Sequence, residues 1–138
     1  MKNFKPVIVN GEIVSDYFVN RIGIILSTKR KAKRFLKPQT CRTRPYPFVN
    51  LQISGNSRAT MIHRIVCESF VPYPTSYPGV SADDWRKTPN SVKLIMMKTM
   101  EVNHKNGNIL DFRLSNLEWT TAEENVNHYY ETRVRCKR

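Results

Sequence analysis

Residues 101–130, EVNHKNGNILDFRLSNLEWTTAEENVNHYY, constrain the fold of this chain more than any other segment. The stretch 101–104 is typical of the end of a short strand, and the next four residues form a turn in which Gly107 can adopt a positive φ. A returning strand is then anchored by three apolar side chains, Leu114, Leu117 and Trp119. The segment therefore predicts two strands joined by a loop.

A helix is predicted directly after the second strand. Thr120 precedes Glu123 by three residues, and Thr121 precedes Glu124 by the same interval, which is the spacing of a capping box. The sequence leaves open which threonine caps the helix, and we expect the helix to extend to about Arg133. Residues 101–130 thus predict strand, loop, strand and helix in succession.

A large excess of positive charge indicates a polyanionic partner. The chain has 23 Lys and Arg residues against 11 Asp and Glu residues, for a net charge of +12 and a pI near 10.0. A protein that neutralises phosphates releases their condensed counterions, so this charge favours binding to nucleic acid. Solubility alone, or attraction to an acidic membrane surface, would be the alternative explanation.

Residues 29–44, here called the basic stretch, contain eight basic residues and no acidic one. Phe35, Leu36 and Pro38 interrupt the stretch, which favours a strand edge or a loop over a long helix. We expect its basic side chains to contact phosphates, with a solvated surface as the alternative. They are Lys29, Arg30, Lys31, Lys33, Arg34, Lys37, Arg42 and Arg44.

Size and composition exclude several classes of protein. A length of 138 residues suits one domain, and 40% hydrophobic with 25% charged residues is typical of a soluble globular chain. No apolar run approaches the roughly 20 residues that span a bilayer, and the N-terminus lacks the features of a signal peptide. We therefore expect a cytoplasmic protein without a membrane partner. The three cysteines form no CxxC pair, which argues against a structural zinc site and a disulfide framework.

The first seventy residues predict strands followed by a helix. Asn10-Gly11 lies between two β-branched runs, which is a strong hairpin signal. Residues 47–53 alternate in the manner of a half-buried strand, and residues 63–70 have helical spacing that Pro72 ends. We expect this helix to pack on the sheet, with His63 in a packing or capping role.

Residues 71–90 contain four prolines and predict an irregular excursion in which a helix could begin near Ser81. The apolar residues between 92 and 100 fit either a helix or a buried strand, and their periodicity does not decide between the two. Together the segments predict an α+β fold, in which a small antiparallel sheet with a packed helix is followed by the strand–loop–strand–helix segment.

VNHKNGNILDFRLSNLEW followed by ENVNH resembles the HNH (ββα-metal, or His-Me finger) motif of phage and intron homing endonucleases. Upstream, VNRIGIILSTKRKAKRFLKP, FVNLQI and IHRIVCESFVP are similar to the module that precedes this motif and is associated with DNA binding. The resemblance implies an N-terminal DNA-binding module at 1–72, a proline-rich insertion or linker at 73–100, and a nuclease motif with a basic tail at 101–138. It also implies that the protein is located in the cytoplasm of a phage-infected bacterial cell.

The resemblance assigns roles to individual residues. His104 matches the general base that activates the attacking water, and Asn116 matches the asparagine that braces the loop and orients this base. Asn103 and Asn125 occupy the two metal-ligand positions. Asp111 and Arg113 resemble residues that stabilise the loop. His128 could make an accessory contact to phosphate or metal, or it could occupy an exposed position on the helix.

The implied function is metal-dependent hydrolysis of double-stranded DNA, with Mg²⁺, or Mn²⁺, as the cofactor because amide oxygens suit these ions better than zinc. One departure from the family pattern is Asn103, since that position is often Asp or His. A DNA-binding protein with a degenerate metal site is therefore one alternative. An RNA-directed nuclease or binding protein is the other, because the basic surface would attract either nucleic acid. A homodimer would allow both strands to be cut, and the sequence does not decide whether one forms.

Overall fold

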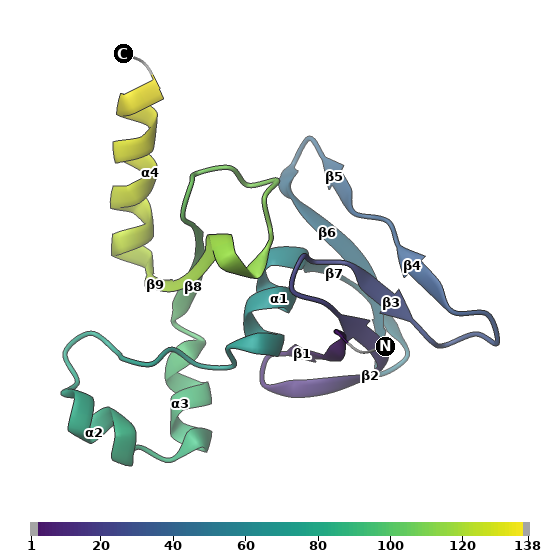
Figure 1. Cartoon of the computed structure of the whole chain (residues 1–138), viewed down its shortest axis with the longest axis horizontal. Coiled ribbons are helices and arrows are strands. Elements are labelled where there is room, and N and C mark those ends of the chain that lie inside the picture. The colour runs from purple at the N-terminus through teal and green to yellow at the C-terminus, as the bar shows by residue number, and fades with distance from the viewer. Residues whose placement is uncertain (1–2, 137–138) are drawn as a thin grey trace.

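The computed structural model describes residues 3–136, with side chains through Glu131 except that of Tyr129. Within these residues the chain forms three antiparallel sheets and four α-helices (Figure 1). The predicted α+β class is confirmed, although the strands before residue 62 divide into two sheets where we expected one. The expected contribution of the basic tail, 133–138, lies outside the described side chains. None of the described helices is long and apolar enough to cross a membrane.

The first sheet has the order β1-β2-β3-β4, formed by Lys5–Val9, Glu12–Val19, Ile25–Ser27 and Arg34–Leu36. The predicted hairpin at Asn10-Gly11 joins β1 to β2, and both turn residues have positive φ, 53° and 81°. The left-handed conformation costs glycine and asparagine less than other residues, which explains this dipeptide at the turn.

The second sheet has the order β5-β6-β7, formed by Gln39–Cys41, Arg44–Ile53 and Asn56–Met61. Strand β6 contains the predicted strand 47–53. The basic stretch begins after β3, forms the outer strand β4, crosses to the outer strand β5 and enters β6. It therefore follows sheet edges, as expected, and contains no helix.

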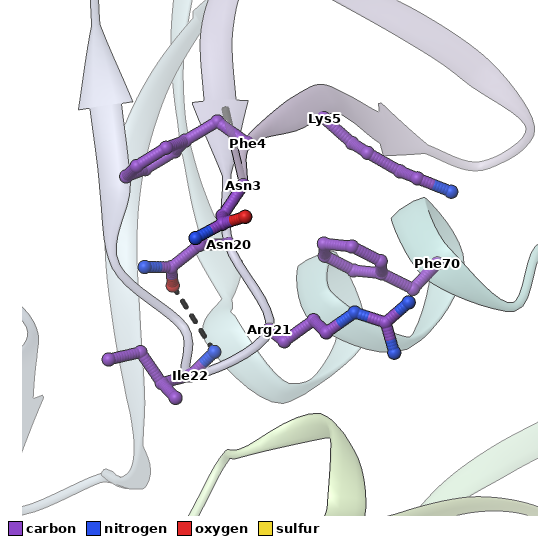
Figure 2. A pocket seen from close by; sticks show the side chains of 7 residues that line it. All are labelled: Asn3, Phe4, Lys5, Asn20, Arg21, Ile22 and Phe70. Carbon is purple, nitrogen blue, oxygen red and sulfur yellow. Dashed lines mark hydrogen bonds between the residues drawn. The ribbon is translucent and has the colours of Figure 1, made fainter. Parts of the chain in front are cut away.

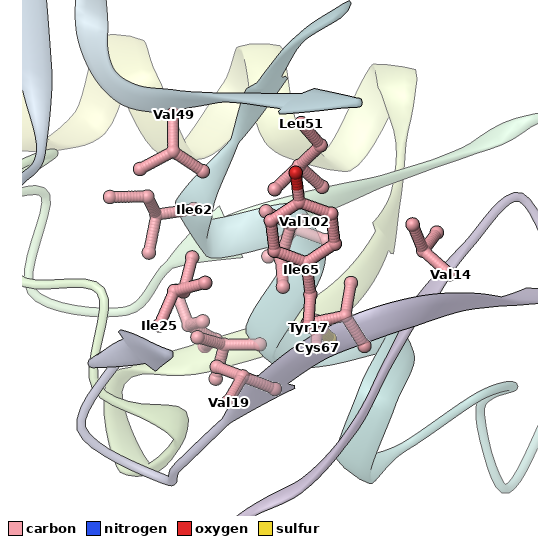
Figure 3. Packing of buried hydrophobic residues seen from close by; sticks show 13 residues of the cluster. Val14, Tyr17, Val19, Ile25, Val49, Leu51, Ile62, Ile65, Cys67 and Val102 are labelled. Carbon is pink, nitrogen blue, oxygen red and sulfur yellow. The ribbon is translucent and has the colours of Figure 1, made fainter. Parts of the chain in front are cut away.

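Helix α1, Ile62–Phe70, packs at the centre of the molecule and corresponds to the predicted helix 63–70. Ile62, Ile65 and Val66 are fully buried against residues of both sheets (Figure 3). The same cluster of buried side chains includes Val102 and Leu117 from the third sheet. One hydrophobic core thus connects the N-terminal sheets to the segment expected to carry the chemistry.

Residues 73–100 contain two short helices, α2, Ala82–Lys87, and α3, Asn90–Met97. Ser81 caps α2 by accepting a hydrogen bond from the Asp84 amide at 3.1 Å, as the sequence suggested. The ambiguous apolar run is resolved as helix up to Met97, and a strand begins at Met100. Trp85 is buried and donates its indole hydrogen to the carbonyl of Pro74 at 2.9 Å, which ties α2 to the proline-rich loop.

The third sheet pairs β8, Met100–His104, with β9, Leu117–Thr121, and α4, Ala122–Cys136, follows directly. The predicted strand–loop–strand–helix order is present, with a short 3-10 turn, Leu114–Asn116, before β9. Thr121 is the cap left open by the sequence: it accepts from the Glu124 amide, and Glu124 accepts from the Thr121 amide, both at 3.1 Å. Helix α4 extends away from the sheets (Figure 1).

Candidate active site

The end of β8 and the loop after it position the candidate catalytic residues. His104 is the last residue of β8 and pairs with Leu117 of β9, while Asn103 pairs with Glu118. The loop closes on itself through backbone hydrogen bonds from Lys105 to the Asn116 carbonyl at 2.8 Å and from Gly107 to the His104 carbonyl at 2.9 Å. Gly107 has a φ of 75°, which a glycine adopts without strain, as expected of this turn.

Asn116 connects the two ends of the loop. Its side-chain oxygen accepts from the Asn106 amide at 3.0 Å, and its nitrogen donates to the Asp111 carbonyl at 2.8 Å and to the Asn106 side chain at 3.0 Å. Asp111 in turn binds Arg113 at 2.8 and 2.9 Å. The hydrogen bond from Arg113 lowers the pKa of Asp111 to about 2. Asn116 is buried, so its three bonds hold the loop in one conformation.

A cavity of about 380 Å³ lies between β8, α4 and Tyr46 of β6, and we call it the His104 cavity. It brings together four of the residues singled out in the sequence, Asn103, His104, Asn125 and His128. Asn116 does not line it and acts from behind, through the loop. The other residues around the cavity are apolar or aromatic, except for the loop glycine: Tyr46, Val102, Gly107, Ile109, Val126 and Tyr130.

His104 is 5% exposed, and its Nε2 atom is buried without a hydrogen-bond partner among the described residues. Burial lowers the pKa of its imidazole, and the charge of Asp111 partly opposes this. His104 is therefore neutral at neutral pH. Since Nε2 is enclosed, Nδ1 is the ring nitrogen left to face the cavity.

Two further rings pack against that of His104. His63 of α1 lies with its ring centroid 4.9 Å away, and Tyr46 of β6 lies 5.8 Å away. His63 is 8% exposed, and burial, followed by the charges of His104 and Arg64, lowers its pKa to about 3. The expected packing role of His63 is thus observed, but its partner is the candidate base itself.

Asn103 and Asn125 each donate their side-chain N–H to a glutamate. The acceptors are Glu118, at 2.9 Å from Asn103, and Glu101, at 2.6 Å from Asn125. These bonds orient both amides, so that each carbonyl oxygen is left for another partner. Oxygen donors of this type suit Mg²⁺ or Mn²⁺. In the part of the chain that the structure describes, no group of three or more His, Cys, Asp and Glu residues could hold a metal ion instead.

His128 lies on α4, one turn after Asn125, with its Nε2 atom 3.1 Å from the Lys105 carbonyl. This contact joins α4 to the loop that follows His104. Trp119, for which we expected a core position, donates to the Val71 carbonyl at 2.7 Å and packs against the hydrophobic core.

The eight basic residues of the basic stretch are all exposed, and none of them lines the His104 cavity. Lys29 donates to the Gln52 carbonyl at 3.2 Å and lies over the Tyr17 ring, and Arg44 lies over the Phe48 ring. Strands β4 and β5 lie on the opposite side of the molecule from α4 (Figure 1). The basic stretch therefore does not line the candidate site, although Arg44 belongs to the same strand, β6, as Tyr46 of the cavity.

A second cavity, of about 510 Å³, lies beside the start of β1 and contains none of the residues singled out in the sequence. Lys5 and Arg21 both lie over the Phe70 ring, at 5.2 and 5.3 Å from its centroid (Figure 2). The Asn20 side chain accepts from the Ile22 amide at 3.2 Å and so serves its own turn. The contacts of Lys5, Arg21 and Asn20 are thus made with other residues that line this cavity.

The sequence did not single out Tyr46, Glu101 or Glu118, although each contacts a candidate residue. Glu118 could have been found from the strand register, because two strands joined by a loop place it opposite Asn103. Tyr46 reaches the site from a strand almost sixty residues earlier, and the sequence carries no signal for this approach.

Residues 60–127 match the sequence model of a family described as HNH endonuclease. An uncharacterised HNH endonuclease, L245, of Acanthamoeba polyphaga mimivirus is 24% identical over 121 residues, which are 88% of this chain and 29% of that protein. A structure of DNA binding and cleavage by the HNH homing endonuclease I-HmuI aligns with a TM-score of 0.59 and 23% identity, over 85% of this chain and 53% of that one. The chain thus spans under a third of the first relative and about half of the second.

Proposed function

The chain belongs to the HNH endonuclease family through residues 60–127, and from this premise we propose that it is a DNA endonuclease with His104 as its general base. The observation that carries the proposal is the His104 cavity itself. There the neutral imidazole of His104 and the oriented amides of Asn103 and Asn125 line one space of about 380 Å³. A neutral base beside two amide oxygens that can ligate a metal ion suits metal-assisted phosphodiester hydrolysis.

His104 would take a proton from the water that attacks the scissile phosphate. A base must be unprotonated at working pH, and burial lowers the pKa of His104 to meet this need. Asn116 would keep the base in place by holding the loop, through its three hydrogen bonds to Asn106 and Asp111. It acts on the reaction only through this loop, because it does not line the cavity.

Asn103 and Asn125 would hold a divalent cation, Mg²⁺ or Mn²⁺, through their side-chain oxygens. When bound, such an ion would stabilise the negative charge that develops on the phosphate and the leaving oxygen. Both ligands are neutral, and the nearest carboxylates, Glu101 and Glu118, hydrogen-bond to the ligands themselves. We therefore expect weak metal binding until DNA phosphates add their charge to the site.

Double-stranded DNA is the proposed substrate. The net charge of +12 and the eight exposed basic residues of the basic stretch support a phosphate-binding surface. The solved relative is an HNH homing endonuclease whose structure concerns DNA binding and cleavage, which supports DNA as the polymer. Its homing activity supports a mobile-element role for this chain, in which recognition would rest on the N-terminal module.

The test is a plasmid assay with the wild type and His104→Ala, each with Mg²⁺, Mn²⁺ or EDTA. We expect metal-dependent nicking or linearisation by the wild type, and a loss of about 10²- to 10⁴-fold in the variant with unchanged DNA affinity. A genomic DNA panel covers the case in which the plasmid lacks a target. Equal loss of binding in the variant would show that His104 is structural.

The second candidate function is DNA binding without cleavage, and Asn103 is the observation that favours it. A neutral ligand whose amide already binds Glu118 attracts a cation less than a carboxylate would. Binding of the DNA panel without cleavage under any metal condition would establish this function. Competition between DNA and RNA of equal length would distinguish a DNA-directed protein from an RNA-directed one. Sedimentation of the complex would show whether the protein binds as a homodimer.

A further inference from the structure

The rings of His63 and His104 each hold a buried nitrogen without a hydrogen-bond partner among the described residues. The atoms are Nδ1 of His63 and Nε2 of His104. Buried polar atoms are nearly always paired, so two such atoms on neighbouring rings require an explanation. The ring centroids are 4.9 Å apart, with an angle of 62° between the planes.

We propose that His63 is a positioning residue that accepts a hydrogen bond from Nε2–H of His104 and thereby fixes the tautomer of the base. This inference rests on the proposed function and adds a residue to it. The rings meet edge to face with their centroids 4.9 Å apart, a separation at which a change of ring orientation can bring two ring nitrogens towards hydrogen-bond distance. The two nitrogens make no hydrogen bond in the present ring orientations, so the proposed bond requires a rotation about χ2, which is a soft torsion in histidine.

The direction of the hydrogen bond decides whether His104 can act as a base. A neutral imidazole has one donor and one acceptor nitrogen. If Nε2 of His104 carries the hydrogen, the lone pair is on Nδ1, which faces the cavity. If His63 donated instead, the lone pair of His104 would point into the protein and could not reach a water in the cavity.

The surroundings of His63 suit a fixed acceptor. Burial keeps His63 neutral, with a pKa lowered to about 3, so the residue has an acceptor nitrogen throughout the neutral pH range. It lies in the first turn of α1, between Ile62 and the core residue Ile65, both fully buried. Tyr46 covers both imidazoles, with its centroid 5.3 Å from His63 and 5.8 Å from His104. Helix α1 therefore fixes the position of His63, and the ring of Tyr46 packs against both histidines.

The first test is an NMR measurement on the metal-free protein. Long-range nitrogen–proton correlations distinguish the two tautomers of a neutral imidazole, and the three histidines are assigned by substituting each in turn. We expect the Nε2–H tautomer for His104 in the wild type and a mixture of tautomers in His63→Phe, which keeps an aromatic ring but has no acceptor. The Nδ1–H tautomer in the wild type, or an unchanged tautomer in His63→Phe, would overturn the inference.

The second test measures cleavage by His63→Phe and His63→Gln, the latter of which retains an acceptor. We expect kcat to fall about 10- to 100-fold in His63→Phe, with KM and DNA affinity unchanged, and to recover in part in His63→Gln. Cys67→Ala is the control, because Cys67 is also buried in the same helix and does not line the His104 cavity. A kcat loss in the control as large as in His63→Phe would show that any damage to α1 has this effect, and would refute the positioning role.

The two tests separate failure of this inference from failure of the proposed function. If the wild type cuts no DNA, the endonuclease proposal fails, while the tautomer of His104 still decides whether the two histidines are paired. If the wild type cuts and His63→Phe has the same kcat, the positioning role fails and the endonuclease proposal stands.

Discussion

The His104 cavity and the basic stretch present different kinds of polar residue in different surroundings, His and Asn at the cavity and Lys and Arg along the stretch. At the cavity, His104 is buried against the rings of Tyr46 and His63, and behind it Asn116 is buried and hydrogen-bonded to the loop. Along the basic stretch, the charged side chains are exposed and make few interactions with the rest of the protein. Catalysis needs groups fixed before the substrate arrives, whereas phosphate binding needs charge that can adapt to a flexible polyanion. The comparison predicts that substitutions in the two regions will change different measured quantities.

The largest expected effect is on acid stability and comes from the buried region. Because the pKa of His63 falls from 6.5 to about 3 on folding, the unfolded chain binds more protons than the folded one between these values. Above pH 6.5 His63 is neutral in both states, and the free energy of unfolding has its full value. As pH falls towards 3, protonation of His63 favours the unfolded chain and lowers this free energy by on the order of a few kcal/mol. Denaturant unfolding from pH 3 to 8 measures it.

The groups that bear on His63 in this experiment are His104 and Arg64, and both oppose its protonation. His63→Phe should flatten the pH dependence of unfolding relative to the wild type. Substitutions in the basic stretch should leave it unchanged. An equal pH dependence in His63→Phe would mean that His63 titrates alike in the folded and unfolded chains.

The next effect is on DNA affinity and comes from the exposed region. A triple substitution to Gln at Arg30, Lys31 and Lys33 should weaken binding about a hundredfold at low salt, and reduce the slope of log K against log salt by about 0.9 for each phosphate that is no longer neutralised. The stability and the kcat at saturating DNA should not change. Fluorescence anisotropy over a salt series measures both the affinity and the slope.

A triple substitution of the same charge change on residues 73–100 serves as the control, at Arg86, Lys87 and Lys98. If this control weakened binding as much as the first variant, the affinity would depend on net charge alone. The proposed role of the basic stretch would then be wrong.

Asn116→Ala should lower both stability and kcat, although Asn116 does not line the cavity. Loss of three hydrogen bonds, one of which satisfies the Asn106 amide, should lower the free energy of unfolding by about 1–3 kcal/mol. The kcat should fall about 10- to 100-fold because the loop no longer fixes His104, while DNA affinity is retained. Ser115→Ala, an exposed neighbour in the same turn, is the control for both measurements. A normal kcat in Asn116→Ala would mean that the loop conformation does not control the orientation of His104.

The smallest effect concerns the metal requirement. Asn103→Asp adds a carboxylate at a proposed ligand position but also places it beside Glu118, whose oxygen lies 2.9 Å from the present amide nitrogen, so that like charges repel. We therefore expect the single variant to change the Mg²⁺ concentration for half-maximal cleavage only slightly, and Asn103→Asp with Glu118→Gln to lower it about tenfold. A titration of metal at saturating DNA measures this. No shift in the double variant would contradict the assignment of Asn103 as a ligand.

Local signals in the sequence predicted much of the fold. Asn10-Gly11 indicated the hairpin because its left-handed turn is a property of two adjacent residues, and the Thr121–Glu124 pair indicated the start of α4 for the same reason. The apolar run before Met97 stayed ambiguous, because a short buried segment has no diagnostic period. Local patterns thus predicted elements whose cause is local.

The arrangement of the site could be predicted from the sequence only in part. Asn103, His104 and Asn125 were singled out through the resemblance to the HNH motif, and the structure places them around one cavity. The contacts of His63 and Tyr46 with His104 depend on how α1 and β6 pack against β8, which no short pattern encodes. The surroundings that determine protonation and orientation therefore required the structure.

The core shared by Val102, Leu117 and the N-terminal sheets bears on how such a protein can evolve. A segment cut out at residue 101 would expose these side chains to water and lose its packing against α1. Recombination that moved the segment from residue 101 alone to another gene would therefore move it without part of its core. Transfer of the proposed activity would be favoured when the preceding strands and helix move with the segment.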